Sequence, residues 1–197
     1  MRHLIAGAAI AALFALPAAA ALKQGDKAPD FKAKASLAGK EFNFDLKAAL
    51  KKGPVVVYFY PAAFTQGCNV EAHTFAENAD KFAAANTTII GVSHDTIDRL
   101  NDFSADPQYC AGKFPVASDP DGAIAKSYNL NIREGRAGAK DSRGKDLITA
   151  GFTERTTFVI TPDSKVVATL SSADDKVTPV EHVEKSLSIA ESVSKKK

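Results

Sequence analysis

The chain lacks the short motifs that identify several common classes of enzyme. It contains no Cys-x-x-Cys, no glycine-rich phosphate loop, no His-Glu-x-x-His and no Gly-x-Ser-x-Gly. These absences remove the sequence signals for a dithiol redox motif, a phosphate-binding loop, a zinc-protease helix and a serine-hydrolase nucleophile. Internal repeats and linkers that would divide the chain are absent as well, so we expect one domain.

A strong charge of either sign is also missing. The chain carries 25 lysines and arginines against 23 acidic residues, a formal net charge of +2. Nothing in this balance recruits nucleic acid. The lysines at 195–197 are interpreted as a solvated helix end that complements the helix dipole. Segment 129–150 is rich in glycine and arginine but interleaved with acids, and is interpreted as a solvated surface loop, with binding of an anionic partner as the alternative.

Residues 1–21 have a basic start, an apolar stretch over 4–16 and small residues after Pro17. This is the pattern of a secretory signal peptide. The apolar stretch is shorter than the ~20 residues of a membrane span, and an uncleaved anchor is the alternative. We expect cleavage after Ala20 or Ala21, a bacterial periplasmic location, no membrane association after cleavage, and one domain over residues 22–197.

The remaining apolar patterns predict an α/β fold, in which helices flank a mixed β-sheet and a β-hairpin precedes it. Alternating residues favour the hairpin, and β-branched runs favour strands between amphipathic helices. The expected strands are 31–37, 41–44, 55–60, 87–92, 114–117, 153–161 and 165–171, and the expected helices are 46–52, 68–82, 96–103 (with a possible continuation towards Cys110), 123–128 and 179–194.

Cysteine is scarce, since Cys68 and Cys110 are the only two. Cys68 follows the apolar run Val55–Tyr60 after a break at Pro61, and it opens a helical pattern. In the first turn of a helix, the partial positive charge and unpaired N–H groups stabilise an anion, and a thiol pKa can fall from about 8.5 to roughly 3.5–7.5. The alternative is an inert packing cysteine, which is the common case for an isolated thiol.

Pro61, Thr65 and Cys68 form Pro-x-x-x-Thr-x-x-Cys, which resembles the active-site signature of the peroxiredoxins, thiol peroxidases of thioredoxin-like fold. Glu71 agrees with that signature. The resemblance covers about residues 25–187 and looks closest to the bacterioferritin-comigratory, or Q-type, branch. Its other landmarks are Gly25–Phe31, Gly91–Asp95, Phe114–Asp119 and Arg155–Asp163.

The resemblance implies a catalytic role for three side chains. Cys68 is the expected peroxidatic nucleophile and becomes a sulfenic acid, Thr65 supplies a hydroxyl to thiolate and peroxide, and Arg155 supplies fixed N–H donors and a permanent charge. The alternatives are a purely capping role for Thr65 and a surface salt bridge for Arg155.

Three further residues are expected around the pocket. The backbone N–H of Gly67 points into it together with that of Cys68, Pro61 shields the thiolate from water, and Glu71 orients an arginine by a charge-assisted pair.

The resemblance also bears on Cys110. One related type places a resolving cysteine five residues after the nucleophile, where this chain has His73. Another type carries it in the third helix, in a context that resembles Tyr109–Pro115 here. An intramolecular Cys68–Cys110 disulfide is therefore expected, and a one-cysteine enzyme with a buried, structural Cys110 is the alternative.

No cofactor and no metal are expected, because His73 and Cys68 are poorly spaced on a helix to share an ion. The implied partners are a peroxide, either hydrogen peroxide or an organic hydroperoxide, and a reductant of thioredoxin or glutaredoxin type or a small thiol. The Q-type resemblance implies a monomer. A function of another class stays open, namely a periplasmic thioredoxin-fold module that senses redox state or binds a partner without turnover.

Overall fold

The computed structural model describes residues 20–135, 138–147 and 149–195. The apolar part of the predicted signal peptide lies outside these residues, so the signal peptide and the exported location stay predictions. Within the described part of the chain, no helix is long and apolar enough to cross a membrane.

Seven strands form the main sheet, in the order β2-β1-β5-β4-β3-β8-β9. The pairs β3–β4 and β4–β5 are parallel, and the other neighbours are antiparallel. The strands are β1 Lys32–Leu37, β2 Lys40–Asp45, β3 Val55–Phe59, β4 Thr88–Ser93, β5 Val116–Ser118, β8 Thr156–Ile160 and β9 Val166–Ser171, and a separate ladder pairs β6 Ile132–Glu134 with β7 Gly151–Thr153.

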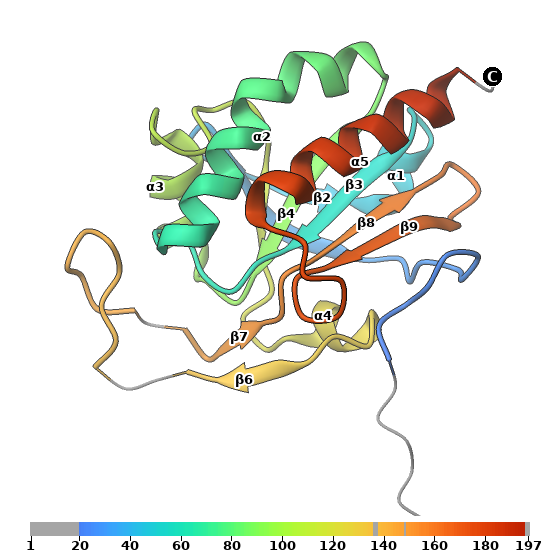
Figure 1. Cartoon of the computed structure of the whole chain (residues 1–197). Helices are drawn as coiled ribbons and strands as arrows, with labels where there is room; N and C mark the ends of the chain where they lie inside the picture. Colours follow the sequence, from blue (N-terminus) through green and yellow to red (C-terminus); the bar gives the residue numbers. More distant parts are fainter. Residues whose placement is uncertain (1–19, 136–137, 148, 196–197) are drawn as a thin grey trace, which may run out of the picture.

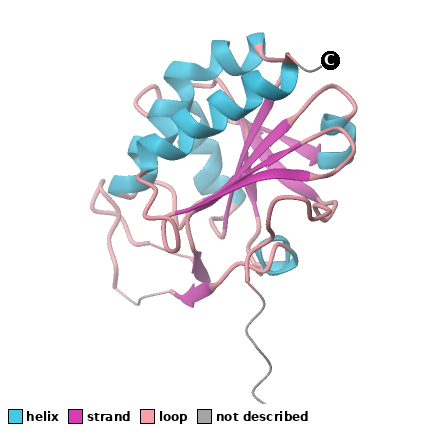
Figure 2. Cartoon of the chain, turned by 45° about the vertical axis from the view of Figure 1, so that its right-hand side comes forward, coloured by secondary structure: helices cyan, strands magenta, loops and turns pink. Residues whose placement is uncertain are grey.

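Helices cover both faces of this sheet (Figures 1 and 2). Helices α2, α3 and α5 pack on one face, and α1 and α4 pack on the other. Because both faces are buried, β3 is apolar at every position, as expected for a central strand in a sheet covered on both sides. The helices are α1 Leu46–Leu50, α2 Gln66–Ala84, α3 Ile97–Ala105, α4 Ala123–Ser127 and α5 Pro179–Ser194.

The predicted fold class is confirmed, with one difference in the hairpin. We expected β1 and β2 to form a small cover ahead of the sheet, but β1 also pairs with β5, so the hairpin becomes one edge of the sheet.

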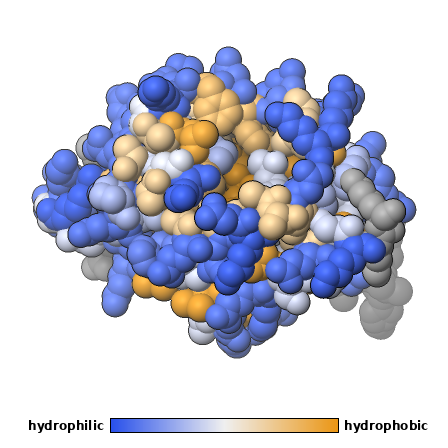
Figure 3. Space-filling view, turned by 90° about the horizontal axis from the view of Figure 1, so that it is seen from above, coloured by the Kyte–Doolittle hydropathy of each residue, from blue (hydrophilic) through white to orange (hydrophobic). Residues whose placement is uncertain are grey.

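At the opposite side of the molecule from α1 and α4, helices α2 and α5 form a surface on which apolar residues gather between hydrophilic ones (Figure 3). Val70 and Val180 are the large apolar side chains exposed on these two helices.

Three predictions of local structure are wrong. The expected loop 129–150 contains β6, which pairs with β7 directly after the segment. The strand expected from Thr153 is interrupted, because the chain leaves β7 there and β8 begins only at Thr156. Helix α3 does not continue to Cys110, since turns replace it after Asp106 and the Gly112 N–H returns to the Ser104 carbonyl at 2.8 Å.

Candidate active site

Cys68 lies at the start of α2, just after the chain leaves the central strand β3. Strand β3 ends at Phe59, a short loop follows, and Cys68 is the third residue of the helix. Its side chain is buried, with 2% of the residue exposed. The first helical turn leaves backbone N–H groups without intrahelical partners, so this sulfur lies at the positive end of a five-turn helix.

Arg155 joins Cys68 to a buried carboxylate. Its Nη2 donates to the Cys68 Sγ at 3.3 Å, and its Nη1 donates to the Glu71 carboxylate. Glu71 lies one turn after Cys68 and is fully buried. Arg155 sits immediately before β8, which pairs with β3, so the ladder fixes its backbone opposite the start of the nucleophile loop. The guanidinium therefore faces the Cys68 sulfur and is not a surface group.

Gly67 allows the guanidinium to come this close. A Cβ at Gly67 would lie 3.2 Å from Arg155 Nη2 and 3.7 Å from Pro179 at the start of α5. A side chain there would push on the group that contacts the sulfur. The glycine therefore favours the close approach of Arg155, and its own backbone conformation does not demand it.

Thr65 precedes α2 in the N-cap position, yet its side chain caps no helix N–H. Its hydroxyl lies beside the Cys68 sulfur and donates to the Ala62 carbonyl at 2.8 Å; turned from that carbonyl, the same O–H donates to a thiolate and lowers the pKa of Cys68. Pro61 directly follows the buried Tyr60 and is half-buried at the edge of the loop. The structure thus brings Thr65, Gly67, Cys68, Glu71 and Arg155 into one site, with Pro61 on the loop that leads to it.

The electrostatics of the thiol differ from the expectation. Burial raises the pKa of Cys68 above its ordinary value, although the Arg155 cation and the Thr65 hydroxyl lower it in part. The predicted fall in pKa at a helix N-terminus is wrong for this closed arrangement, because desolvation penalises the thiolate more than its neighbours stabilise it. The anion therefore depends on those two donors.

Glu71 and Arg155 form a coupled buried pair. Burial raises the pKa of Glu71 to about 7, while Arg155 opposes the rise. Burial alone would lower the pKa of Arg155, but the charges of Glu71 and Cys68 raise it above the ordinary value. Arg155 is therefore a permanent cation next to the sulfur.

His182 is linked to Arg155 through Ser172, and it was not predicted from the sequence. The imidazole is fully buried on α5, with Nδ1 at 2.9 Å from the Thr157 hydroxyl and Nε2 at 2.9 Å from the Ser172 hydroxyl. The Ser172 N–H in turn donates to the Arg155 carbonyl at 3.1 Å. No local signal could reveal this histidine, because it reads as one more position of an amphipathic helix.

His182 makes the stability of the protein sensitive to acid. Burial, aided by Arg155, lowers the pKa of His182 to about 4 from an ordinary 6.5. Between pH 6.5 and 4, His182 is protonated in the unfolded chain but neutral in the folded chain. This histidine therefore lowers the free energy of unfolding as pH falls over that range, by about 3 kcal/mol in all. We expect His182→Gln to flatten that decline in denaturant titrations over this range.

The matched control for that experiment is His73→Gln, on the exposed face of α2. A His182→Gln variant that loses stability between pH 6.5 and 4 as steeply as the wild type would contradict the account.

Cys110 lies in the turns that follow α3, fully buried, and both cysteines carry free thiols. Burial, and then the charge of Asp106, raises the pKa of Cys110 well above its ordinary value. The two thiols belong to one packed cluster of side chains between the sheet and helices α2, α3 and α5. The structure places them in the same core without bonding them.

Neither His73 nor His94 contributes to a metal site in the part of the chain that the structure describes. His73 pairs with Glu77 on the exposed face of α2 at 3.4 Å, and His94 is buried beside Gly122. Among the described residues, no group of three or more potential His, Cys, Asp or Glu ligands is assembled.

Comparison with known proteins gives consistent results. A family model described as AhpC/TSA family matches residues 24–169. A protein of Mycobacterium tuberculosis with a provisional peroxiredoxin name is 36% identical over 146 residues, which cover 74% of this chain and 83% of that protein. Peroxiredoxin Bcp of Xanthomonas campestris is 34% identical over 113 residues, covering 57% and 63% of the two chains.

Solved structures agree. The crystal structure of peroxidoxin BcpB from Mycobacterium tuberculosis superposes with a TM-score of 0.71 at 29% identity, over 87% of this chain and 98% of the other. Xanthomonas campestris peroxiredoxin Q superposes with a TM-score of 0.61 at 27% identity, over 82% and 90%. The resemblance to the Q-type branch is confirmed by these matches.

Proposed function

We propose that this chain, which belongs to the AhpC/TSA family and is a thiol-dependent peroxidase, reduces peroxide through the thiolate of Cys68. The contact between Arg155 Nη2 and the Cys68 sulfur carries the proposal. A packing cysteine needs no cation, and a surface arginine needs no thiol. Two buried groups of this kind are held together for chemistry.

In the reaction, the Cys68 thiolate attacks one oxygen of the peroxide and the O–O bond breaks. The departing oxygen takes the electron pair and a proton, and leaves as water or an alcohol, while Cys68 becomes a sulfenic acid. Arg155 and the Thr65 hydroxyl donate to the oxygens on which charge develops, in a site from which bulk water is excluded.

The surrounding residues fix those donors in place. Glu71 holds one side of the guanidinium, so the other side points at the sulfur. The N–H groups of Gly67 and Cys68 are available in the first turn of α2, and the Pro61 ring limits the approach of water to the thiolate.

We further propose that Cys110 resolves the sulfenic acid. Its thiol attacks the Cys68 sulfur, which releases water and leaves a disulfide, and an external thiol then reduces that bond. A disulfide needs Cα atoms about 5.5–6 Å apart. Since one partner lies in a helical turn and the other is buried in a separate turn, the first turn of α2 and the segment around Cys110 have to rearrange.

The setting of this reaction follows from the predicted signal peptide. We propose that the enzyme is a monomer of the bacterial periplasm that accepts hydrogen peroxide or organic hydroperoxides. Its reductant is a protein of thioredoxin or glutaredoxin type, or a small thiol. The exposed Val70 and Val180 near the active-site end of α2 and α5 give such a reductant an apolar surface to approach.

Cys110→Ser tests the resolving role. We expect this variant to complete one fast turnover and then to accumulate sulfenic and sulfinic acid at Cys68, because no internal thiol competes with a second peroxide. Intact-mass measurement after graded peroxide should find one and then two added oxygens. A wild type that itself gains oxygens, with no internal disulfide, would support the one-cysteine alternative.

A further inference from the structure

Residues 138–147, here called the clamp segment, lie against the loop that carries the active site. We expected a solvated excursion, but the Ser142 N–H donates to the Phe64 carbonyl at 2.8 Å. Asn69 on α2 donates to the Ser142 hydroxyl at 3.1 Å. The segment therefore touches the chain both before and after Cys68.

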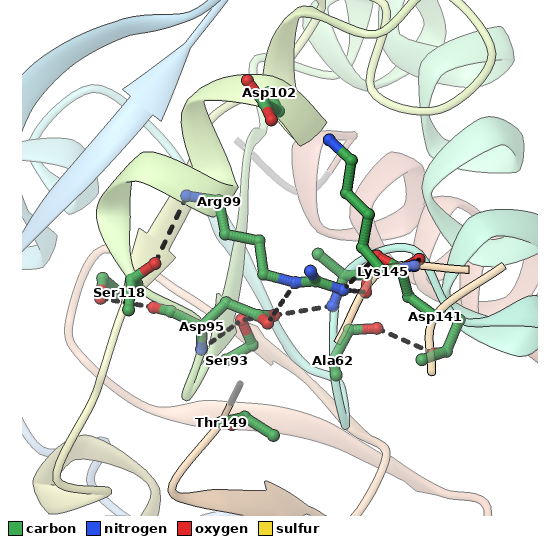
Figure 4. A network of polar contacts seen from close by, with 12 residues as sticks. Ala62, Ser93, Asp95, Arg99, Asp102, Ser118, Asp141, Lys145 and Thr149 are labelled. Atoms are coloured by element: carbon green, nitrogen blue, oxygen red, sulfur yellow. Dashed lines mark hydrogen bonds and ion pairs between the residues drawn. The ribbon is translucent and has the colours of Figure 1, made fainter. Parts of the chain in front are cut away.

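A buried cluster of charges fixes this contact (Figure 4). The Asp141 side chain is fully buried and accepts from Arg99 Nη2 at 2.9 Å. Arg143 Nη2 donates to the same side chain at 2.9 Å. It also accepts the backbone N–H groups of Arg143 and Lys145 at 2.9 and 3.0 Å. These bonds give both arginines and the turn of the clamp segment one common anchor.

The same cluster forms hydrogen bonds with both backbone groups of Ala63. Arg99 Nη2 donates to the Ala63 carbonyl at 2.8 Å, and the Ala63 N–H donates to the Asp95 carboxylate at 2.7 Å. Arg99 Nε lies 3.0 Å from the other oxygen of Asp95 (Figure 4). Two residues before Thr65, the backbone is thus held on both sides by the cluster.

Phe64, the next residue, adopts a conformation that needs such support. Its φ of +59° lies in the left-handed region, which costs a non-glycine residue of order 1–3 kcal/mol and persists only where the surroundings enforce it. The Arg143 guanidinium lies 3.2 Å from the centroid of its ring, and that of Arg99 lies 5.2 Å away. One cation from the clamp segment and one from α3 thus contact the ring.

The ring of Phe64 also reaches the neighbourhood of the second cysteine. It packs edge-to-face on Phe103 and Tyr109, with centroids 5.0 and 5.5 Å apart. Tyr109 immediately precedes Cys110. One aromatic side chain therefore joins the loop of Cys68, the turn of Cys110 and the clamp segment.

We propose that Asp141 and Arg143 are positioning residues that hold the Phe64 ring packed against Tyr109. They thereby set the rate at which oxidised Cys68 reaches Cys110. This inference rests on the proposed function. The closed loop presents Cys68 to Arg155 for attack on peroxide, whereas disulfide formation requires Phe64 and Tyr109 to separate. Weakening the contacts of Asp141 and Arg143 accelerates disulfide formation and slows the attack of Cys68 on peroxide.

Arg143→Met tests the proposal, because methionine keeps the apolar stem over the ring and removes the cation. In rapid-quench experiments with one equivalent of hydrogen peroxide, followed by alkylation and mass analysis, we expect disulfide formation to speed up by about fivefold or more, the order given by loss of one partly exposed cation–π contact. The yield of sulfinic acid under excess peroxide should fall, and the peroxide step should slow.

Asp141→Asn is the second variant, since it removes the anchor charge while keeping the shape of the side chain. Lys140→Gln is the matched control, because Lys140 pairs with Asp146 on the exposed side of the same segment. Amide hydrogen exchange should rise together at residues 61–69 and 108–112 in Arg143→Met and in Asp141→Asn, and stay at the wild-type level in Lys140→Gln.

The outcomes separate the two proposals. Wild-type protein that does not consume peroxide overturns the proposed function, and wild-type protein that consumes it without a Cys68–Cys110 disulfide overturns the resolving role and the clamp together. If wild type forms the disulfide but folded Arg143→Met and Asp141→Asn form it no faster than Lys140→Gln, the clamp alone is wrong.

Discussion

Replacing Cys68 with serine is expected to abolish peroxide turnover and to leave the fold intact. Serine fills nearly the same buried volume, but its alcohol is not ionised near neutral pH and is a far weaker nucleophile than a thiolate. Arg155 and Thr65 then surround a group that cannot attack the O–O bond. The measurement is peroxide consumption by the reduced protein with a chemical dithiol, together with thermal unfolding to verify the fold.

Cys110→Ser is the control for that experiment, because it removes the other thiol and is expected to keep the first turnover. If Cys68→Ser still consumed peroxide within seconds, the nucleophile would have to be another group, and the assignment of the site would be wrong.

Arg155→Lys is expected to lower the second-order rate constant for peroxide by roughly ten- to a thousandfold, the range for loss of one charge-stabilising donor. Arginine contacts Glu71 through Nη1 and Cys68 through Nη2 at the same time. A lysine carries the same charge on a single nitrogen, which cannot reproduce the planar fork between carboxylate and sulfur.

Competition kinetics against a reporter peroxidase measure this rate constant directly. Arg133→Lys, at an exposed position of β6, is the matched control and should retain the wild-type value. Equal rate constants for Arg155→Lys and wild type would show that the guanidinium takes no part in the reaction.

The sequence was sufficient for the fold class and for the place of Cys68. The apolar run of β3 is unbroken because the strand is covered on both faces, and the break at Pro61 marks where it leaves the sheet. Such signals are local, so one sequence contains them. Helix α2 begins within two residues of the expected start, which puts Cys68 in the first turn as predicted.

Long-range contacts escaped the same reasoning. Asp141 meets Arg99 across 42 positions, and His182 meets Thr157 across 25. The clamp segment has the mixed charge and glycine content of an ordinary solvated loop, so composition could not reveal that one of its aspartates is buried. The raised pKa of Cys68 was missed for a related reason, because a helix N-terminus is visible in sequence while desolvation depends on everything packed around it.

Peroxide is expected to oxidise Cys68 first, and Cys110 is then expected to form a disulfide with it. The most direct test adds one equivalent of hydrogen peroxide to reduced wild-type protein, blocks free thiols, and combines intact mass with a non-reducing peptide map. We predict a loss of two hydrogens and a single linked pair of peptides containing Cys68 and Cys110. Unmodified Cys68, with the oxidation found elsewhere in the chain, would contradict the account.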